Sequence, residues 1–347
     1  MSDPSDYTQV SVAGTDYFLR NAANCGPVVG YRHDVARDVW RSLRPGPRPR
    51  HCGNLAAFAH GADIHVLNVA DVPGGGISMS IHHTASGSWE ALDTVSLDPC
   101  VVMGLATGIL CTRRGEESLP LRYSWFDYQA SRWRDGSVDL GVANTGERVQ
   151  PVTVGGRALA LSTVWPPDFS VGGTMTLVTF DPSTGQRLSS TSREMSVDAL
   201  QAAEGGNLQA AGPGYVYLGP RSFTSSTKEA DLVDLRTGQW STLQMPVQGA
   251  TQRSDADWVA DYYGDDAAGY VVANDYLYDP GARRWLAVPT TGIAPPDRDS
   301  ESDSLMTRAG PRQQCTWTGT RECWALDIGS LEGVSTELEA SELPVPR

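Results

Sequence analysis

The chain has 347 residues, and its 27 Lys and Arg side chains against 41 Asp and Glu side chains leave a formal net charge of −14 at pH 7. A surface with this excess of negative charge repels nucleic acid backbones and anionic membranes, so neither is expected as a partner. No stretch approaches the ~20 consecutive apolar residues that cross a bilayer, and residues 1–15 lack the basic and apolar parts of a signal peptide.

Glycine and proline recur between short hydrophobic runs, with 36 glycines and 22 prolines in the chain. This distribution indicates tight turns between short strands. Length alone would favour about two domains of ~150 residues each, but a closed ring of repeats takes up a whole chain. We therefore expect a single domain that spans residues 1–347.

One pattern recurs along the chain: a hydrophobic run ends in an acidic residue, a turn follows, and a tryptophan stands six residues later. Its complete copies are Asp34 to Trp40, Asp127 to Trp133, Asp234 to Trp240 and Asp279 to Trp285. Three copies are weaker: His83 replaces the acid before Trp89, Leu188 stands for the tryptophan after Asp181, and no aromatic follows Asp327. The seven markers recur about every 49 residues. A period near 50 in an all-β pattern indicates a β-propeller.

We predict an all-β fold, a seven-bladed β-propeller of four-stranded antiparallel blades. In each blade the acidic residue closes the third strand and its carboxylate accepts backbone N–H bonds in the turn. The tryptophan opens the fourth strand, and its indole packs between blades. Rings of six or eight blades remain open, as does a quinoprotein-like propeller suggested by the tract from Asp181 to Gly185.

The predicted strands follow in chain order. The first unit has strands at 9–12, 17–19, 28–31 and 39–40, and the second at 55–59, 64–69, 77–82 and 89–92. The third runs from Val101 to beyond Trp133, the fourth has strands at 152–154, 158–164 and 175–180, and the fifth at 215–218 and 232–233. The sixth has strands at 257–262, 269–273, 276–279 and 285–288, and the seventh contains Cys315 and Cys323. Because strands are used in order, the ring is predicted to close without a borrowed terminal strand.

The six cysteines fall into three local pairs: Cys25 with Cys52, Cys100 with Cys111, and Cys315 with Cys323. None has the Cys-x-x-Cys spacing of a zinc knuckle or a redox motif. An even number of pairable cysteines favours disulfides and an oxidising compartment, either extracellular or in the periplasm and cell envelope, with the leader absent from this chain. Buried free thiols in a cytosolic protein are the alternative.

The tract from Tyr276 to Trp285 resembles the third strand, turn and fourth strand of a kelch repeat, and the tract from Asp234 to Trp240 is similar. The resemblance covers the chain by its period, and the motif itself is good in four or five of the seven units. The paired glycine, Gly155-Gly156, stands before the second strand, whereas kelch repeats carry it after that strand. The resemblance implies a divergent kelch-like propeller of the galactose oxidase central-domain superfamily.

The copper oxidases of that superfamily surround their metal with a tyrosine crosslinked to cysteine, a second tyrosine and two histidines. All six histidines of this chain lie in the first 83 residues, so that ligand set is not expected. Sialidase-type propellers place an aromatic five residues after the aspartate, whereas here it comes at six. His82 and His83 are adjacent on a predicted strand and point to opposite faces, so they do not form a metal pair. A hydrogen bond in the turn explains His83.

In such blades the connections after the second and fourth strands leave one face, named the loop face, and the turns between third and fourth strands leave the opposite turn face. The long connections of the loop face are predicted at 70–76, 165–174, 219–228, 248–255 and 290–304. We predict ligand binding there by Trp165, Asp168, Phe169, Arg221 and Phe223, because aromatics beside a carboxylate suit stacking on a sugar or an apolar side chain. The alternative is that Trp165 ends a buried strand and Phe169 fills the top of the blade.

Two charged segments have simpler interpretations. The arginines Arg41, Arg44, Arg48 and Arg50 lie in a proline-rich tract that predicts a stiff, solvated connector between blades. The acidic loop from Asp297 to Asp303, like Asp265 and Asp266, offers carboxylate oxygens that suit Ca2+, but it lacks EF-hand spacing and a solvated loop is favoured. Apart from a structural Ca2+ at such a loop, no cofactor is expected.

The chain lacks a Gly-x-Ser-x-Gly elbow, a phosphate-binding loop and a His-Glu-x-x-His helix. The favoured interpretation is a secreted or cell-envelope propeller, monomeric and without a catalytic role, that binds a glycan or protein partner through its loop face. The alternative is a secreted enzyme acting on glycans, a hydrolase or lyase, with carboxylates at the channel mouth. An intracellular scaffold ranks third, because kelch adaptors usually carry a fused domain.

Overall fold

The computed structural model describes residues 7–34, 36–37, 39–70, 75–92, 95, 100–113, 120–141, 148–154, 157–164, 172–197, 199–200, 208–211, 214–218, 229–244, 271–273, 276–287, 305–310, 313–317, 321–325 and 333–334. Within these ranges the strands form seven antiparallel sheets, six of four strands and one of three. The fold is an all-β propeller, as predicted, and the number of described sheets equals the number of predicted units.

The first four sheets use consecutive strands. They are β1 (Thr8–Val12), β2 (Thr15–Asn21), β3 (Val28–Asp34) and β4 (Val39–Ser42); β5 (Asn54–His60), β6 (Asp63–Val69), β7 (Ile77–His83) and β8 (Ser88–Ala91); β9 (Cys100–Leu105), β10 (Gly108–Arg113), β11 (Leu121–Asp127) and β12 (Arg132–Val138); and β13 (Arg148–Val154), β14 (Arg157–Val164), β15 (Gly173–Asp181) and β16 (Gln186–Met195).

The remaining sheets complete the ring. The fifth has β17 (Leu208–Ala211), β18 (Tyr215–Leu218), β19 (Glu229–Asp234) and β20 (Gln239–Gln244). The sixth has β21 (Val271–Ala273), β22 (Tyr276–Asp279), β23 (Arg284–Ala287) and β27 (Gly333–Val334), and the three-stranded sheet has β24 (Leu305–Gly310), β25 (Gln313–Trp317) and β26 (Arg321–Ala325).

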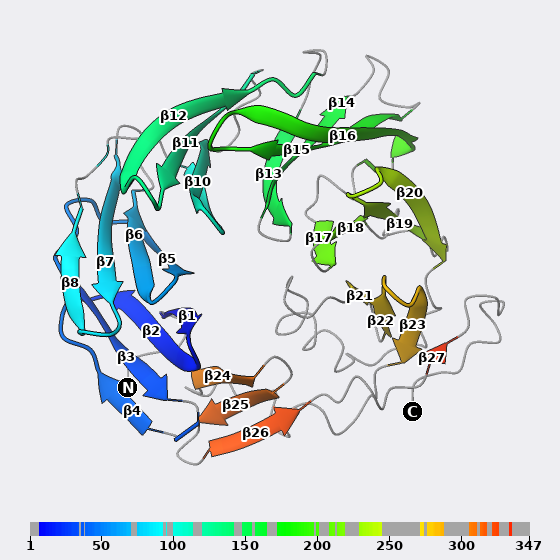
Figure 1. Ribbon diagram of the computed structural model, residues 1–347. Helices are drawn as coiled ribbons and strands as arrows, with labels where there is room; N and C mark the ends of the chain where they lie inside the picture. Colours follow the sequence, from blue (N-terminus) through cyan, green and yellow to red (C-terminus); the bar gives the residue numbers. More distant parts are fainter. Residues whose placement is uncertain are drawn as a thin grey trace.

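The sheets follow one another around a central axis, and the sheet of β24 to β26 comes between the sixth sheet and the first (Figure 1). The first strands of neighbouring sheets contact each other, as β1 does with β5 and β13 with β9 and β17. Each of the first five sheets therefore runs outward from its first strand to its fourth.

The sixth sheet departs from the predicted order of strands. Its outer strand β23 pairs with β27, with Trp285 opposite Val334. The prediction that every strand is used in order is wrong here, because the backbone groups on the open edge of β23 can also pair with a segment from the C-terminal part of the chain. The predicted strand at 257–262 lies outside the described residues.

The tryptophans of the repeat pack between sheets, as their spacing predicts. Trp285 is only 1% exposed, and its indole N–H donates to a backbone oxygen of the preceding sheet. The indole N–H groups of Trp240 and Trp89 also donate to groups that precede their own sheets. The three bonds run from Trp285 Nε1 to Gln244 O at 3.0 Å, from Trp240 Nε1 to Thr191 Oγ1 at 2.8 Å, and from Trp89 Nε1 to Arg44 O, in the connector before its sheet, at 2.9 Å.

The fourth unit uses a different side chain in this position. Its strands shift register between Thr179 and Phe180, so that Phe180 pairs with Arg187. Arg187, six residues after Asp181, donates from Nη1 at 3.1 Å to Leu140 O, two residues after the end of β12 in the preceding sheet. The expectation that Leu188 replaces the tryptophan is therefore wrong, since Leu188 falls in the bulge and is 54% exposed.

Apolar cores fill the boundaries between successive sheets. Tyr17 and Leu19 of the first sheet pack against Ile64 and Val66 of the second. The other described boundaries hold equivalent clusters: Leu67 and Met79 with Ile109 and Phe126, Leu110 and Trp125 with Val178 and Phe180, and Met175 and Leu177 with Val216 and Val233. Packing on both faces explains why β6 is buried from Ile64 to Val69 and β7 from Ile77 to His82.

In the described units that carry the tryptophan, the residue before the marker pairs with it across the hairpin. The register places these two residues opposite each other, since the hairpin is closed by the acid and by the residue before the tryptophan. Four such ring pairs are described, with centroids 4.4 Å apart for His33 and Trp40, 4.6 Å for His82 and Trp89, 5.4 Å for Phe126 and Trp133, and 5.0 Å for Tyr278 and Trp285.

The acidic markers hold the turns as predicted. Asp127 Oδ1 accepts the backbone N–H groups of Gln129 and Ala130 at 2.9 and 3.1 Å. Asp34, Asp181, Asp234 and Asp279 accept equivalent bonds at 2.8 to 3.1 Å from Arg37, Ser183, Arg236 and Ala282. A short acceptor at the end of the third strand thus satisfies backbone donors that the hairpin leaves unpaired.

Two of the three predicted disulfides are present. Cys25–Cys52 joins the β2–β3 connection to the segment before β5, and Cys100–Cys111 joins β9 to β10. Cys315 and Cys323 occupy directly paired positions on β25 and β26, and their disulfide stays a prediction. The two disulfides indicate an oxidising, non-cytoplasmic environment. In the described part of the chain, no helix is both long and apolar enough to span a membrane.

Candidate functional site

The two faces of the ring differ in the lengths of their connections. Through the first five sheets, the turns between first and second and between third and fourth strands have only two to four residues. The connections on the opposite, loop face, within these sheets and from one of them to the next, have six to twelve. Because consecutive strands are antiparallel, all of these longer connections leave the ring on the same side.

The five predicted ligand-binding residues all lie outside the described residues. Trp165, Asp168 and Phe169 belong to the connection between β14 and β15, and Arg221 and Phe223 belong to the connection between β18 and β19. These connections leave neighbouring sheets on the loop face. The acidic segment 297–303 and the pair Asp265 and Asp266 also lie outside the described residues.

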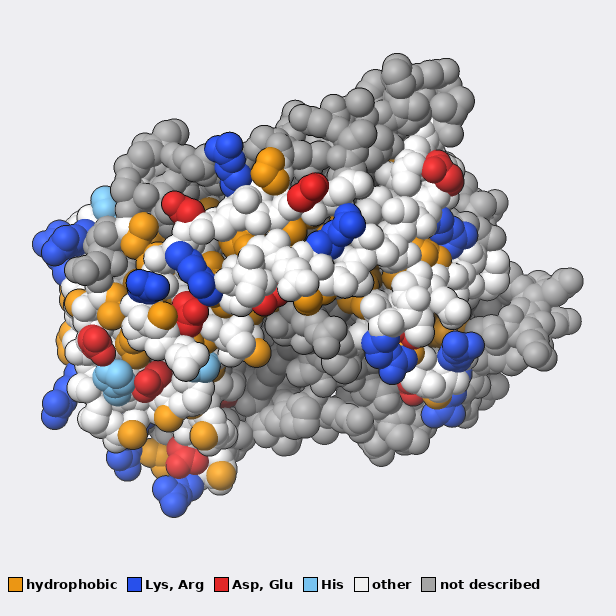
Figure 2. Space-filling view, turned by 45° about the horizontal axis from the view of Figure 1, so that its top comes forward, with side chains coloured by type: hydrophobic (Ala, Val, Ile, Leu, Met, Phe, Trp, Pro, Cys, Tyr) orange, Lys and Arg blue, Asp and Glu red, His pale blue; other side chains and the backbone are white. Residues whose placement is uncertain are grey.

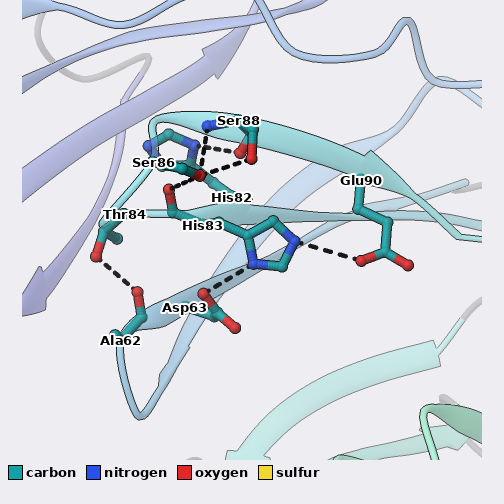
Figure 3. Close-up of polar contacts among 8 residues, drawn as sticks. All are labelled: Ala62, Asp63, His82, His83, Thr84, Ser86, Ser88 and Glu90. Carbon is teal, nitrogen blue, oxygen red and sulfur yellow. Dashed lines mark hydrogen bonds and ion pairs between the residues drawn. The ribbon is translucent and has the colours of Figure 1, made fainter.

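His82 and His83 occupy opposite faces of β7, as predicted. His82 is 1% exposed and stacks on Trp89 at the boundary with the first sheet. His83 lies on the face toward the third sheet, where its ring is between two carboxylates (Figure 3). The two histidines therefore cannot share one metal ion.

The ring of His83 bridges two strands at the turn face. Nδ1 is 3.0 Å from Asp63 Oδ1 at the start of β6, and Nε2 is 3.3 Å from Glu90 Oε2 on β8 (Figure 3). The hydrogen bond to Asp63, with smaller contributions from the Glu90 carboxylate, raises the pKa of His83 above 6.5. The expectation of a turn hydrogen bond from this side chain is wrong, because an imidazole reaches past the turn to carboxylates on neighbouring strands.

Burial has the opposite effect on the other histidines of this sheet. It lowers the pKa of His82 below 6.5, and the positive charges of His83 and Arg32 lower it further. Burial also lowers the pKa of His65 to about 4, with a smaller contribution from His60. One face of the second sheet thus carries a protonatable imidazole at its rim and a neutral one in its interior.

His65 belongs to a cluster of rings between the second and third sheets. Tyr128 stacks on His60 with centroids 4.0 Å apart and lies 4.5 Å from His65. Within the described ranges, His65 Nδ1 and the Tyr128 hydroxyl are buried without a hydrogen-bond partner. Burial also raises the pKa of the Tyr128 hydroxyl. These rings pack against one another and fill the space between the second and third sheets.

Among the described residues, no group of three or more His, Cys, Asp or Glu side chains is arranged to hold a metal ion. The surface in Figure 2 carries basic, acidic and apolar side chains interspersed over the described sheets. A cluster of side chains with the same charge is therefore a distinct feature on this mixed surface.

A pocket of about 200 Å³ in the first sheet was not predicted from the sequence. Arg41, interpreted above as part of the connector, lies on β4 and lines this pocket, whereas Arg44, Arg48 and Arg50 do lie in the connector between β4 and β5. The sequence signal that could have indicated this pocket is the register of the β3–β4 hairpin. Asp34 pairs with Val39 next to the turn. The residues two positions farther from the turn on each strand, Arg32 and Arg41, therefore pair as well.

No family model and no curated protein matches the chain. Among solved structures, an oligogalacturonate lyase in complex with manganese is similar at 10% identity and a TM-score of 0.45, over 81% of this chain and 72% of that one. An oligogalacturonate lyase from Vibrio parahaemolyticus is similar at 9% identity and a TM-score of 0.45, over 79% of this chain and 70% of that one.

Proposed function

We propose that this protein is an extracellular or cell-envelope recognition module that binds a glycan through the loop face of its propeller. The observation that carries the proposal is the contrast between the two faces, with connections of two to four residues on one and six to twelve on the other through the first five sheets. A rigid frame with long connections on a single face is the usual way in which propellers present binding residues.

The composition of those connections supports a sugar as the ligand. Trp165 and Phe169 flank Asp168 in one connection, and Arg221 and Phe223 stand in the next. Aromatic faces stack on sugar rings, while carboxylates and guanidinium groups bind hydroxyl and acidic substituents. Two disulfides in the frame support a location outside the cytoplasm. We also keep kelch-like ancestry, a single domain and a monomeric state as parts of this proposal.

A glycan array tests the proposal with the wild type, Trp165→Ala and a matched control. Leu188→Ala serves as the control because Leu188 is an exposed apolar residue on the outer strand of the same sheet. We expect the wild type and the control to retain the same glycan, and Trp165→Ala to bind it roughly tenfold more weakly with an unchanged melting temperature. Retention of no glycan, or equal binding by all three proteins, would overturn the proposal.

A glycan-cleaving enzyme is the second candidate, and the similar solved structures are oligogalacturonate lyases. The retained glycan is therefore also incubated with the protein, and the products are separated by chromatography. We expect the glycan to be recovered intact. Catalytic amounts of protein that shorten it would replace the binding module with the enzyme hypothesis.

A further inference from the structure

We infer that the turn end of the first sheet holds a second binding site, specific for a small oxyanion group such as a sulfate or a carboxylate. The site lies on the turn face, so it is separate from the proposed glycan site on the loop face. It is a pocket of about 200 Å³ lined by Thr15, Arg32, Asp34, Arg37, Val39 and Arg41.

The register of the sheet brings these side chains to one face. Thr15 pairs with Asp34, and Asp34 pairs with Val39, which forms one row across β2, β3 and β4. Arg32 pairs with Arg41 two residues further along the strands, and residues two apart point to the same side of a sheet. Arg37 reaches the pocket from the β3–β4 turn.

The arrangement of charge is unfavourable without a ligand. Arg32 and Arg41 stand directly opposite each other, and like charges in that position destabilise a strand pair. Within the described part of the chain, neither guanidinium has a hydrogen bond or an ion pair. A pocket lined by charges of one sign attracts a ligand of the opposite sign.

The single carboxylate of the pocket is already engaged. Asp34 Oδ1 accepts the backbone N–H of Arg37 at 3.1 Å, and Asp34 Oδ2 is 3.5 Å from the Arg37 guanidinium. Three guanidinium groups therefore face one carboxylate that holds the turn. This local excess of positive charge contrasts with the net charge of −14 of the whole chain.

The chemistry of the lining defines the ligand. A guanidinium presents parallel N–H donors that match the paired oxygens of a carboxylate, sulfate or phosphate. The Thr15 hydroxyl adds a neutral donor and Val39, 40% exposed, adds an apolar wall. A volume of about 200 Å³ is below the usual range for drug-sized ligands, so the pocket suits one acidic group and the small unit that carries it.

Calorimetric titrations of the whole protein at low ionic strength test the site, with sodium sulfate, sodium glucuronate and uncharged glucose as probes. Arg32→Gln and Arg41→Gln remove one guanidinium each. Arg122→Gln is the matched control, because Arg122 is an exposed arginine on β11 of the third sheet. We expect saturable binding of an anion but not of glucose, a loss of about tenfold or more in both pocket variants, and no change in the control.

The two anions distinguish the source of the acidic group. Binding of sulfate alone assigns the pocket to inorganic oxyanions, and tighter binding of glucuronate assigns it to a carboxylate on a sugar. The absence of saturable binding by either anion, or equal affinities in the wild type and both pocket variants, would overturn the inference. Arg41→Gln should also melt no lower than the wild type in the absence of anion, since it relieves a like-charge pair.

The loop-face variant keeps the two proposals apart. Trp165→Ala should bind these anions as the wild type does, and Arg32→Gln should keep the glycan retained on the array. Loss of anion binding in Trp165→Ala would place both ligands in one site and would contradict a separate pocket.

Discussion

The residue that closes the third strand decides how each hairpin is held. An aspartate in this position is short enough to accept the N–H groups of its own turn, as Asp127 does from Gln129 and Ala130. The imidazole of His83 instead crosses to Asp63 and Glu90 on the flanking strands. One substitution in the repeat thus turns a local turn acceptor into a link between three strands.

The ion pairs of His83 make a prediction about pH. Its pKa should lie above 6.5, and Asp63→Asn should bring it back toward that value, because the bond to Asp63 is the main cause of the shift. A folded-state pKa above the unfolded value stabilises the fold below pH 6.5, and this contribution is lost as the pH rises through the folded-state pKa. Both groups are partly exposed, so the effect on stability is small.

NMR titration of the histidine side chains measures this directly, and His82 is the internal control. Its pKa is lowered by burial, so its signals should titrate below 6.5 while those of His83 titrate above. A His83 pKa at or below 6.5 in the wild type would show that the two carboxylates do not hold the ring in solution.

At the scale of the hairpin, the tryptophan of the fourth strand connects its own sheet to the preceding one. Trp285 is 1% exposed and donates to Gln244 O at 3.0 Å. Arg187 makes the same kind of bond in the fourth unit, where a bulge moves Leu188 out to solvent. In both units this position holds a long side chain with an N–H donor near its end. Tryptophan also buries apolar surface there, in addition to making the hydrogen bond.

Trp285→Ala should therefore lower the free energy of unfolding by about 3–5 kcal/mol, since it empties an apolar site and leaves a backbone acceptor unpaired. Leu188→Ala, at the neighbouring position of another unit, should change it by less than about 0.5 kcal/mol because Leu188 is exposed. Chemical denaturation of both variants gives the comparison. Equal stabilities for Trp285→Ala and the wild type would place that indole outside a packed boundary.

The regular features of the hairpins were predictable from sequence because they depend on short spacings. The positions of Asp279 and Trp285 determined a turn, a register and a buried face together. Features that depend on cross-strand neighbours were missed, such as the Asp63 and Glu90 partners of His83 and the facing of Arg32 and Arg41. The pairing of β27 with β23 was also missed, because a two-residue strand carries almost no periodic signal.

At the scale of the molecule, one disulfide joins two successive sheets and the other joins two strands of one sheet. Cys25–Cys52 connects the first sheet to the entry of the second, across 27 residues of sequence. Such a crosslink restricts the unfolded chain and should stabilise the fold by about 2–4 kcal/mol. The Cys315–Cys323 pair would add a link inside the last sheet, where the two residues are directly opposite.

A thiol assay on denatured protein without reductant tests this set of crosslinks. We expect no reactive thiols from the six cysteines. Two reactive thiols would show that Cys315 and Cys323 are reduced. Six reactive thiols would contradict an oxidising compartment and favour the alternative of a cytosolic protein with buried free thiols.

Indole side chains that pack between neighbouring sheets are the central feature of this ring. Hydrogen exchange of the indole N–H groups of Trp240 and Trp285, assigned by single Trp→Phe variants, measures this most directly, because each N–H donates to the preceding sheet. We predict exchange of both far slower than that of an indole open to solvent. Exchange of either indole at the rate of free tryptophan would contradict the packing of these side chains between neighbouring sheets.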